Sequence, residues 1–212
     1  LNMIDKHNLY YEMREKLSTP KCPICNLLSK AVNSYIESLL YEKINDHGTR
    51  DALTKSRGFC HRHSKMLREH GNPLAHAILY SHYLENTLQA TQVLSGEEKR
   101  SLVNTRLFRR QLKGEIECPL CSYQGEAEER YLSSLIDFLR DQDFSAAYSR
   151  SVGVCRPHFL RLYSRFCPRE TKEVIFQRFL RTIEELHAEL EEIKRKTDYR
   201  FAREDVGTER DA

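Results

Sequence analysis

The stretch KCPIC at residues 21–25 returns as ECPLC at 117–121, and these two segments decide how the rest of the sequence is interpreted. Each is followed later by a second cluster, GFCHRH at 58–63 in the first case and GVCRPH at 153–158 in the second. A C-x-x-C pair followed by a C-x-x-H pair has the residue types and spacing of a metal site. The chain therefore carries one ligand pattern twice.

The repetition extends beyond the cysteines. When the sequence is shifted on itself by about 96 residues, SYIESLL (34–40) lies over RYLSSLI (130–136). Farther along, ILYSHYL (78–84) lies over VIFQRFL (174–180). Internal similarity of this extent predicts a tandem duplication of one structural unit.

The duplication sets the expected domain boundaries. With 212 residues, the chain is long enough for two small domains that each bury a core. We expect an N-terminal helical metal-binding repeat at 1–96 and a C-terminal one at 97–200. The last residues, 201–212, have no apolar periodicity and are expected to form a flexible tail.

Composition and periodicity favour an all-α fold. The chain has only 8 glycines and 6 prolines, and strand-like alternation is scarce. Pro23 and Pro119 suit the first turn of a helix, where a proline nitrogen needs no hydrogen-bond partner. Gly58 and Gly153 are expected to break the chain before the next helix. The predicted helices cover about 4–17 and 97–113, the residues after each C-P-x-C, 49–56 and 144–151, the residues after each C-x-x-H, the residues from 73, and 169–198.

Residues three apart in the first turn of a helix share a face, so the cysteines of each C-P-x-C can both point at one ion. The cysteine and histidine of each C-x-x-H can do the same. Pairing the motifs within each repeat gives two sets of three thiolates and one imidazole, each a complete tetrahedral shell. Crossed sites, which pair motifs from different repeats, use the same ligands and remain an alternative. The predicted ligands are Cys22, Cys25, Cys60 and His63 in the first repeat and Cys118, Cys121, Cys155 and His158 in the second.

The repeat also separates ligands from other residues. His61 is aligned with Arg156 of the second repeat, whereas His63 is aligned with His158. The ligand of the first repeat is therefore expected to be His63. Cys167 aligns with Asn72 and is expected to be a spare thiol near a helix cap. The remaining histidines without an aligned counterpart are expected to be ordinary surface or half-buried residues; they are His70, His76, His82 and His187.

Metal binding is favoured over disulfides or redox chemistry. The count of seven cysteines is odd, and no βαβ context surrounds either C-x-x-C. Helix N-termini are expected to lower the pKa of the cysteines and so favour the thiolate that binds metal. Two zinc ions suit closed Cys3His sites, while two iron-sulfur clusters are the alternative, since histidine can replace cysteine in such clusters. Catalytic zinc is less expected because four protein ligands leave no open position.

The segment CPICNLLSKAVNSYIESLLYEKINDHGTRDALTKSRGFCHRHSKMLREHGNPLAHAILYSHYLENTL (22–88), together with the later CPLC, GVCRPH and KTDYRF, resembles a prokaryotic family of functionally uncharacterised proteins with paired C-P-x-C and G-F-C-x-x-H motifs. The resemblance covers most of the chain, and NDHGTRDALTKSRGFCHRH (45–63) is its most specific part. Members continue past DYRF into a Trp-containing end, which implies further residues there. The resemblance brings no activity with it.

The function must therefore be inferred from the sites. A binding or scaffold module is favoured, and an iron-sulfur protein for electron transfer or redox sensing is the alternative. The unknown partner is expected to be a protein. Nucleic acid is possible through basic helices, but the formal charge of +3 is too small to identify it. No apolar run long enough for a membrane span and no signal-peptide pattern is present, so we expect a cytoplasmic protein without a membrane partner. No catalytic constellation is recognised, so a non-enzymatic role is favoured. The basic residues considered for nucleic acid are Lys99, Arg100, Arg106, Arg109, Arg110, Lys113, Arg156, Arg161 and Arg165.

Overall fold

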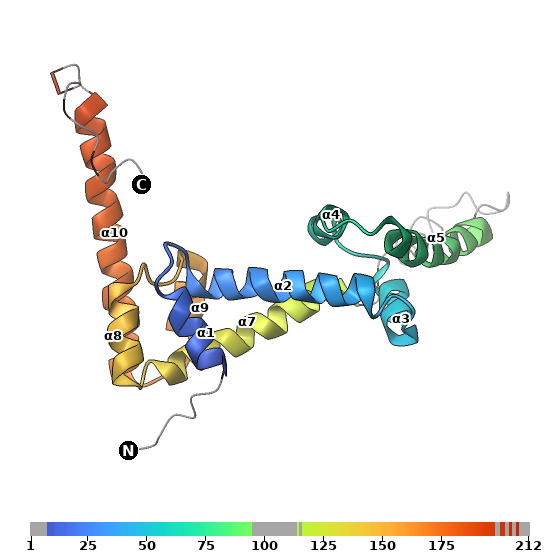
Figure 1. Ribbon diagram of the computed structural model, residues 1–212, viewed down its shortest axis with the longest axis horizontal. Helices are drawn as coiled ribbons and strands as arrows, with labels where there is room; N and C mark the ends of the chain where they lie inside the picture. The colour runs from blue at the N-terminus through green and yellow to red at the C-terminus, as the bar shows by residue number, and fades with distance from the viewer. Residues whose placement is uncertain are drawn as a thin grey trace. The chain divides into compact units, whose positions relative to one another are not determined.

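A computed structural model of the chain describes residues 8–94, 114, 116–197, 200, 201, 204 and 207 (Figure 1). Within these residues all regular secondary structure is α-helical, which confirms the predicted all-α class. The predicted helix at 97–113 and most of the predicted tail at 201–212 lie outside the described residues. The helices are α1 (Asn8–Lys16), α2 (Pro23–Tyr41), α3 (His47–Ser56), α4 (His61–Glu69), α5 (Pro73–Leu94), α7 (Pro119–Phe138), α8 (Gln142–Arg150), α9 (Arg156–Tyr163) and α10 (Arg169–Thr197).

Prolines and glycines mark the ends of these helices as expected. α2, α5 and α7 each begin at a proline, and α10 begins one residue after Pro168. Gly58 and Gly153 have φ angles of 93° and 71°, in the left-handed region that favours glycine. Each turns the chain immediately before the residues that open the C-x-x-H helix. The prolines and glycines of the sequence therefore set the boundaries between the helices.

Two aspartates cap the short helices that precede these glycines. The Asp46 carboxylate accepts a hydrogen bond from the Thr49 backbone N–H at 2.7 Å, and the Asp141 carboxylate accepts one from the Phe144 N–H at 3.0 Å. Such caps satisfy one of the unpaired donors of a helix start. They explain why α3 and α8 each begin two residues before the predicted helix starts at 49 and 144.

The chain divides into two compact units, each made of two chain segments. Unit 1 contains Leu1–Leu27 and Glu129–Ala212, and unit 2 contains Leu28–Glu128. Helix α2 therefore begins in unit 1 and continues in unit 2, while α7 begins in unit 2 and continues in unit 1. This division differs from the repeat ranges 1–96 and 97–200, which remain a prediction from the sequence.

The core of unit 1 joins α1 to α7 and α8 through aromatic rings. The Tyr10 ring lies 5.2 Å from the Phe138 ring and 5.3 Å from the Phe144 ring, measured between centroids. The Tyr10 hydroxyl donates a hydrogen bond of 2.8 Å to Asp141, the carboxylate that caps α8. These contacts hold α1 in place directly before the first C-P-x-C.

The core of unit 2 combines the body of α2 with α3, α4, α5 and the start of α7. Tyr35 of α2 packs against Tyr123 of α7, with 4.5 Å between ring centroids. Cys118 and Leu120, from the second C-P-x-C, belong to the buried cluster itself. The other buried members are Val32, Ile36, Leu39, Leu40, Leu53, Leu67, Ala75 and Leu79.

None of the described helices combines the length and the apolar character that crossing a lipid bilayer requires.

Candidate metal centres

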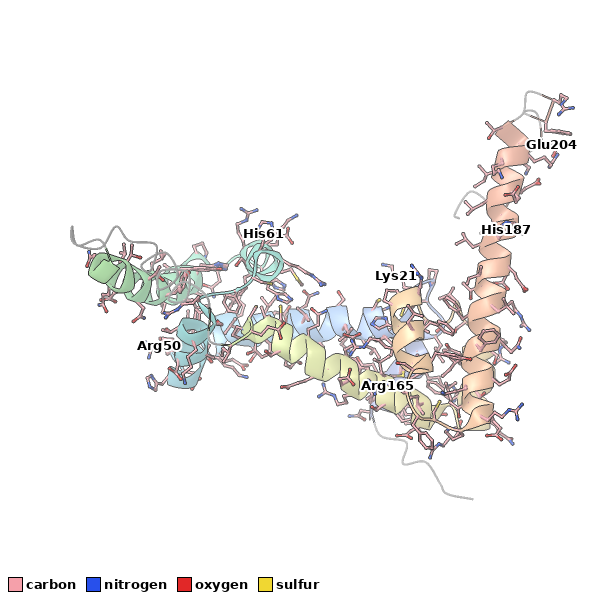
Figure 2. The ribbon with its side chains drawn as sticks, turned by 180° about the vertical axis from the view of Figure 1, so that it is seen from behind. Lys21, Arg50, His61, Arg165, His187 and Glu204 are labelled. Carbon is pink, nitrogen blue, oxygen red and sulfur yellow. The ribbon has the colours of Figure 1, made fainter. Side chains whose placement is uncertain are left out.

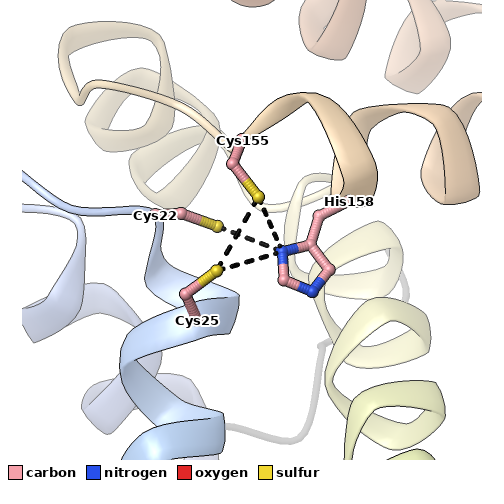
Figure 3. Close-up of side chains that lie close together, drawn as sticks. All are labelled: Cys22, Cys25, Cys155 and His158. Atoms are coloured by element: carbon pink, nitrogen blue, oxygen red, sulfur yellow. Dashed lines mark hydrogen bonds between the residues drawn. The ribbon is translucent and has the colours of Figure 1, made fainter.

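The metal-ligand candidates of unit 1 converge at the starts of α2 and α9 (Figure 3). The Nδ1 atom of His158 lies 3.1 Å from the Cys155 sulfur, 3.4 Å from that of Cys22 and 3.5 Å from that of Cys25. The Cys25 and Cys155 sulfurs are 3.7 Å apart. All four ligand atoms lie within 4.8 Å of one another, so these residues could hold one metal ion.

Unit 2 contains an equivalent group at the starts of α4 and α7. The Nδ1 atom of His63 lies 3.3 Å from the Cys60 sulfur, 3.4 Å from that of Cys121 and 3.6 Å from that of Cys118. The Cys60 and Cys121 sulfurs are 3.6 Å apart. His63 and Cys118 are buried, and the other two ligands are half-buried. The eight predicted ligands thus form two groups of the predicted composition.

The groups are crossed, so the pairing of motifs within each repeat was wrong. The C-P-x-C of the first repeat meets the C-x-x-H of the second, and the reverse holds in unit 2. The reason is the length of the intervening helix. The 19 residues of α2 span about 28 Å, which carries the chain away from Cys25 before Cys60 is reached. Cys60 then packs on the unit 2 core, which includes Leu39 and Leu40 near the end of α2.

The distances agree with four ligands around one ion. Bond lengths of about 2.3 Å to sulfur and about 2.0 Å to nitrogen place tetrahedral ligand atoms about 3.5 to 3.8 Å apart. The observed separations of 3.1 to 3.7 Å fall close to this range. A disulfide is excluded for these pairs, because its sulfurs would be about 2 Å apart and all the cysteines are free.

Hydrogen bonding alone does not account for this arrangement. A neutral imidazole nitrogen carries either one proton or one lone pair, so it can make one good hydrogen bond. In each group, however, one Nδ1 atom faces three sulfur atoms at similar distances. One cation bound by all four atoms would account for this convergence.

The backbone places Cys60 and Cys155 in the same way. Each is the N-cap residue of its helix, with φ −64° and ψ 161°, and neither side chain makes a capping hydrogen bond. Their sulfurs are therefore available to the cluster. His63 and His158 follow three residues later, on the same face of the first helical turn.

The thiol pKa values depart from the expectation that helix N-termini would lower all of them. The pKa of Cys60 is lowered, because hydrogen bonds from the His63 backbone and from neighbouring thiols outweigh its partial burial. Burial raises the pKa of Cys22 and, together with the nearby Cys22 charge, that of Cys25. Burial and the Cys60 thiol also raise the pKa of Cys121 to about 12. Desolvation and mutual repulsion thus oppose a cluster of thiolates unless a cation is bound.

Gln124 is a site residue that the sequence did not identify. Its side-chain carbonyl lies 3.3 Å from Nε2 of His63, so it can accept the N–H of that nitrogen. This contact leaves Nδ1 of His63 free of a proton and directed at the thiols. Burial lowers the pKa of His63, which favours the neutral imidazole that binds metal. The aligned residue in the first repeat is Leu28, so the repeat gave no signal for Gln124.

The other histidines considered in the sequence do not join either metal group. His61 is exposed, His70 pairs with Asn33 at 3.3 Å, and His187 lies 4.0 Å from Glu191. The side chain of His82 and the basic residues of 99–113 lie outside the described residues. Cys167 is half-buried and is not part of either group.

The crossed pairing predicts which thiols a single substitution releases. In the metal-loaded protein, Cys60→Ser should expose Cys118 and Cys121 to alkylation, because they share its site, and should remove one of two metal ions. Cys22 and Cys25 should stay protected. Mass spectrometry of the alkylated peptides reads out each thiol, with Cys155→Ser as the reciprocal variant. Release of Cys22 and Cys25 by Cys60→Ser would show that the sites form within the repeats.

Substitution of Gln124 should change the metal affinity of the unit 2 site only. Loss of an outer hydrogen bond to a metal-ligating histidine typically costs 10-fold to 100-fold in metal affinity. Gln124→Leu should lower the affinity of one site by about that factor, and Gln124→Glu, which keeps an acceptor, should largely restore it. Competition with a chromophoric chelator measures both sites, and the unit 1 site is the internal control. Equal affinity in the Leu variant would contradict the assigned role.

Comparison with known proteins places the chain in a family. A curated protein of Caldicellulosiruptor sp. (strain Rt8B.4), described as an uncharacterized 23.9 kDa protein in the xynA 3' region, is 25% identical over 189 residues. The match covers 89% of this chain and 88% of that protein. No solved structure matches the chain significantly. The model of the family of unknown function DUF6062 matches residues 13–212, and the chain therefore belongs to this family.

Proposed function

We propose that the protein is a non-enzymatic binding or scaffold module in which two Cys3His sites hold structural zinc ions. The observation that carries the proposal is the convergence of three thiols and one imidazole nitrogen within 4.8 Å in each unit. A set of four cysteine and histidine side chains, without a fifth ligand, is the usual donor set of structural zinc.

The compactness of each group favours one ion over a cluster. An iron-sulfur cluster contains inorganic sulfide and more than one iron, so its protein ligands stand farther apart than those around a single metal ion. Here, all four ligand atoms of each group lie within 4.8 Å of one another. Such spacing supports zinc, with the cluster kept as the alternative that the metal analysis below addresses.

The closed shell supports a structural role for the metal. Four protein ligands leave no position for a water or a substrate, which catalytic zinc requires. Structural zinc in small modules contributes on the order of 10 kcal/mol to folding, which is comparable to the whole stability of a typical domain. The ions would therefore hold the starts of α2 with α9, and of α4 with α7, in each unit.

A protein partner fits the surface better than nucleic acid. The second half of α10, where Figure 2 labels His187, carries a row of exposed apolar side chains at spacings of three and four residues. They are Ile183, Leu186, Leu190 and Ile193. Two of the basic residues considered for nucleic acid, Arg161 and Arg165, instead pair with Glu129. A cytoplasmic location completes the proposal, because a reducing compartment keeps the thiols available for metal.

Metal and acid-labile sulfide analysis of protein purified without oxygen tests this proposal. We expect two zinc ions per chain, no sulfide and no visible absorption band, and loss of helical circular dichroism when a strong chelator removes the zinc. Protein treated with chelator already saturated with zinc is the control. Brown protein that contains iron and sulfide would overturn the zinc assignment.

A further inference from the structure

A cavity of about 350 Å³ lies between α4 and α5 in unit 2, and none of the metal-ligand candidates lines it. Residues spaced along one face of α4 form one wall, with His61 at its start, which Figure 2 labels. His76 and Tyr80, one turn apart on α5, form the other wall. The lining residues are His61, Ser64, Lys65, Arg68, His76 and Tyr80.

The lining is basic and contains no carboxylate. It provides an ammonium group, a guanidinium group, two imidazoles and two hydroxyls. The nearest acidic partner of Lys65 is Glu69, at 3.9 Å, and both side chains are about 60% exposed, so this ion pair is weak. The Arg68 guanidinium has no ion-pair partner in the described part of the chain. The two cations are thus available to an anion.

Hydrogen bonds connect two of the lining side chains, Tyr80 and Ser64, to each other and to the backbone. The Tyr80 hydroxyl donates to the Ser64 hydroxyl at 3.3 Å, and Ser64 donates to the Phe59 carbonyl at 3.2 Å. The Nε2 atom of His76 is buried and has no hydrogen-bond partner among the described residues. A buried polar atom without a partner beside a cavity indicates a missing ion, water or ligand group.

The corresponding junction in unit 1 shows that the fold does not require this polar lining. The residues aligned with Ser64, Lys65 and Arg68 are Phe159, Leu160 and Tyr163. There, α9 packs on α10 through aromatic rings: Phe159 stacks on Phe179 with 3.8 Å between ring centroids, and the Tyr163 ring lies tilted 6.1 Å from the Phe176 ring.

The junction between the two helices is therefore packed with apolar side chains in unit 1, whereas in unit 2 it is lined by Lys65 and Arg68 around a cavity. This difference indicates that the polar lining of unit 2 is not needed to hold the helices together.

We propose that the α4–α5 cavity of unit 2 binds the phosphate group of a small molecule. A guanidinium donates two parallel hydrogen bonds to phosphate oxygens, and an ammonium adds a point charge beside it. Hydroxyl and imidazole groups supply further donors. The volume is at the lower end of small-ligand sites, which suits a compact phosphate ester. A hollow of this kind favours a small ligand over the extended backbone of a nucleic acid.

Titration calorimetry on the zinc-loaded full chain tests this proposal with three probes: inorganic phosphate, pyrophosphate, and a short oligonucleotide without terminal phosphates. Arg68→Gln removes the central cation, and Arg68→Tyr copies the residue at the aligned position 163. Arg62→Gln is the matched control, because Arg62 is exposed on the same helix but does not line the cavity. Zinc content and circular dichroism of every variant are measured first.

We expect phosphate and pyrophosphate to bind the unmodified protein, and both Arg68 variants to raise the dissociation constant about tenfold or more. Arg62→Gln should leave it nearly unchanged. Absence of binding at millimolar phosphate and pyrophosphate would overturn the proposal, as would equal weakening by Arg62→Gln. Binding of the oligonucleotide alone, with steep salt dependence, would also overturn it and indicate a diffuse basic surface.

Discussion

The convergence of three thiol groups and one imidazole in each unit is the constraint from which the rest of this account follows. With all the ligand atoms of a group within 4.8 Å of one another, ionisation of all three thiols is opposed by their mutual repulsion and by burial unless a cation is bound. A bound ion would remove this penalty and turn the four groups into a strong contact within each unit. The helices α4 and α9, of 9 and 8 residues, are too short to be stable alone and would gain most from such a contact.

The crossed pairing brings together residues that are far apart in sequence, such as Cys22 with His158 and Cys60 with Cys121. A metal ion bound at each group would therefore act as a long-range link. Each unit is therefore closed by a segment from the other repeat, and α2 and α7 each belong to both units. Sites within the repeats would have linked residues closer in sequence, such as Cys25 and Cys60. Metal bound at the crossed groups would instead make each unit depend on both C-P-x-C and C-x-x-H motifs from distant parts of the chain.

Much of this could be predicted from local sequence. The helix starts followed from Pro23, Pro119 and the glycine at position 58, and the ligand types followed from spacing within one helical turn. The pairing could not be predicted, because it depends on where 19 residues of helix carry the chain. Gln124 was missed for a different reason: its role depends on contact with α4, and its aligned residue is a leucine. The raised pKa values of Cys22, Cys25 and Cys121 were also missed, because burial is a property of the packed units.

The coordination shell itself can be measured most directly by X-ray absorption at the edge of the bound metal. Our account predicts an average shell of three sulfurs at about 2.3 Å and one nitrogen at about 2.0 Å per zinc, with no nearby metal atom. Scattering from a second metal atom, or a shell in which sulfur and nitrogen are not in a three-to-one ratio, would contradict two closed Cys3His sites.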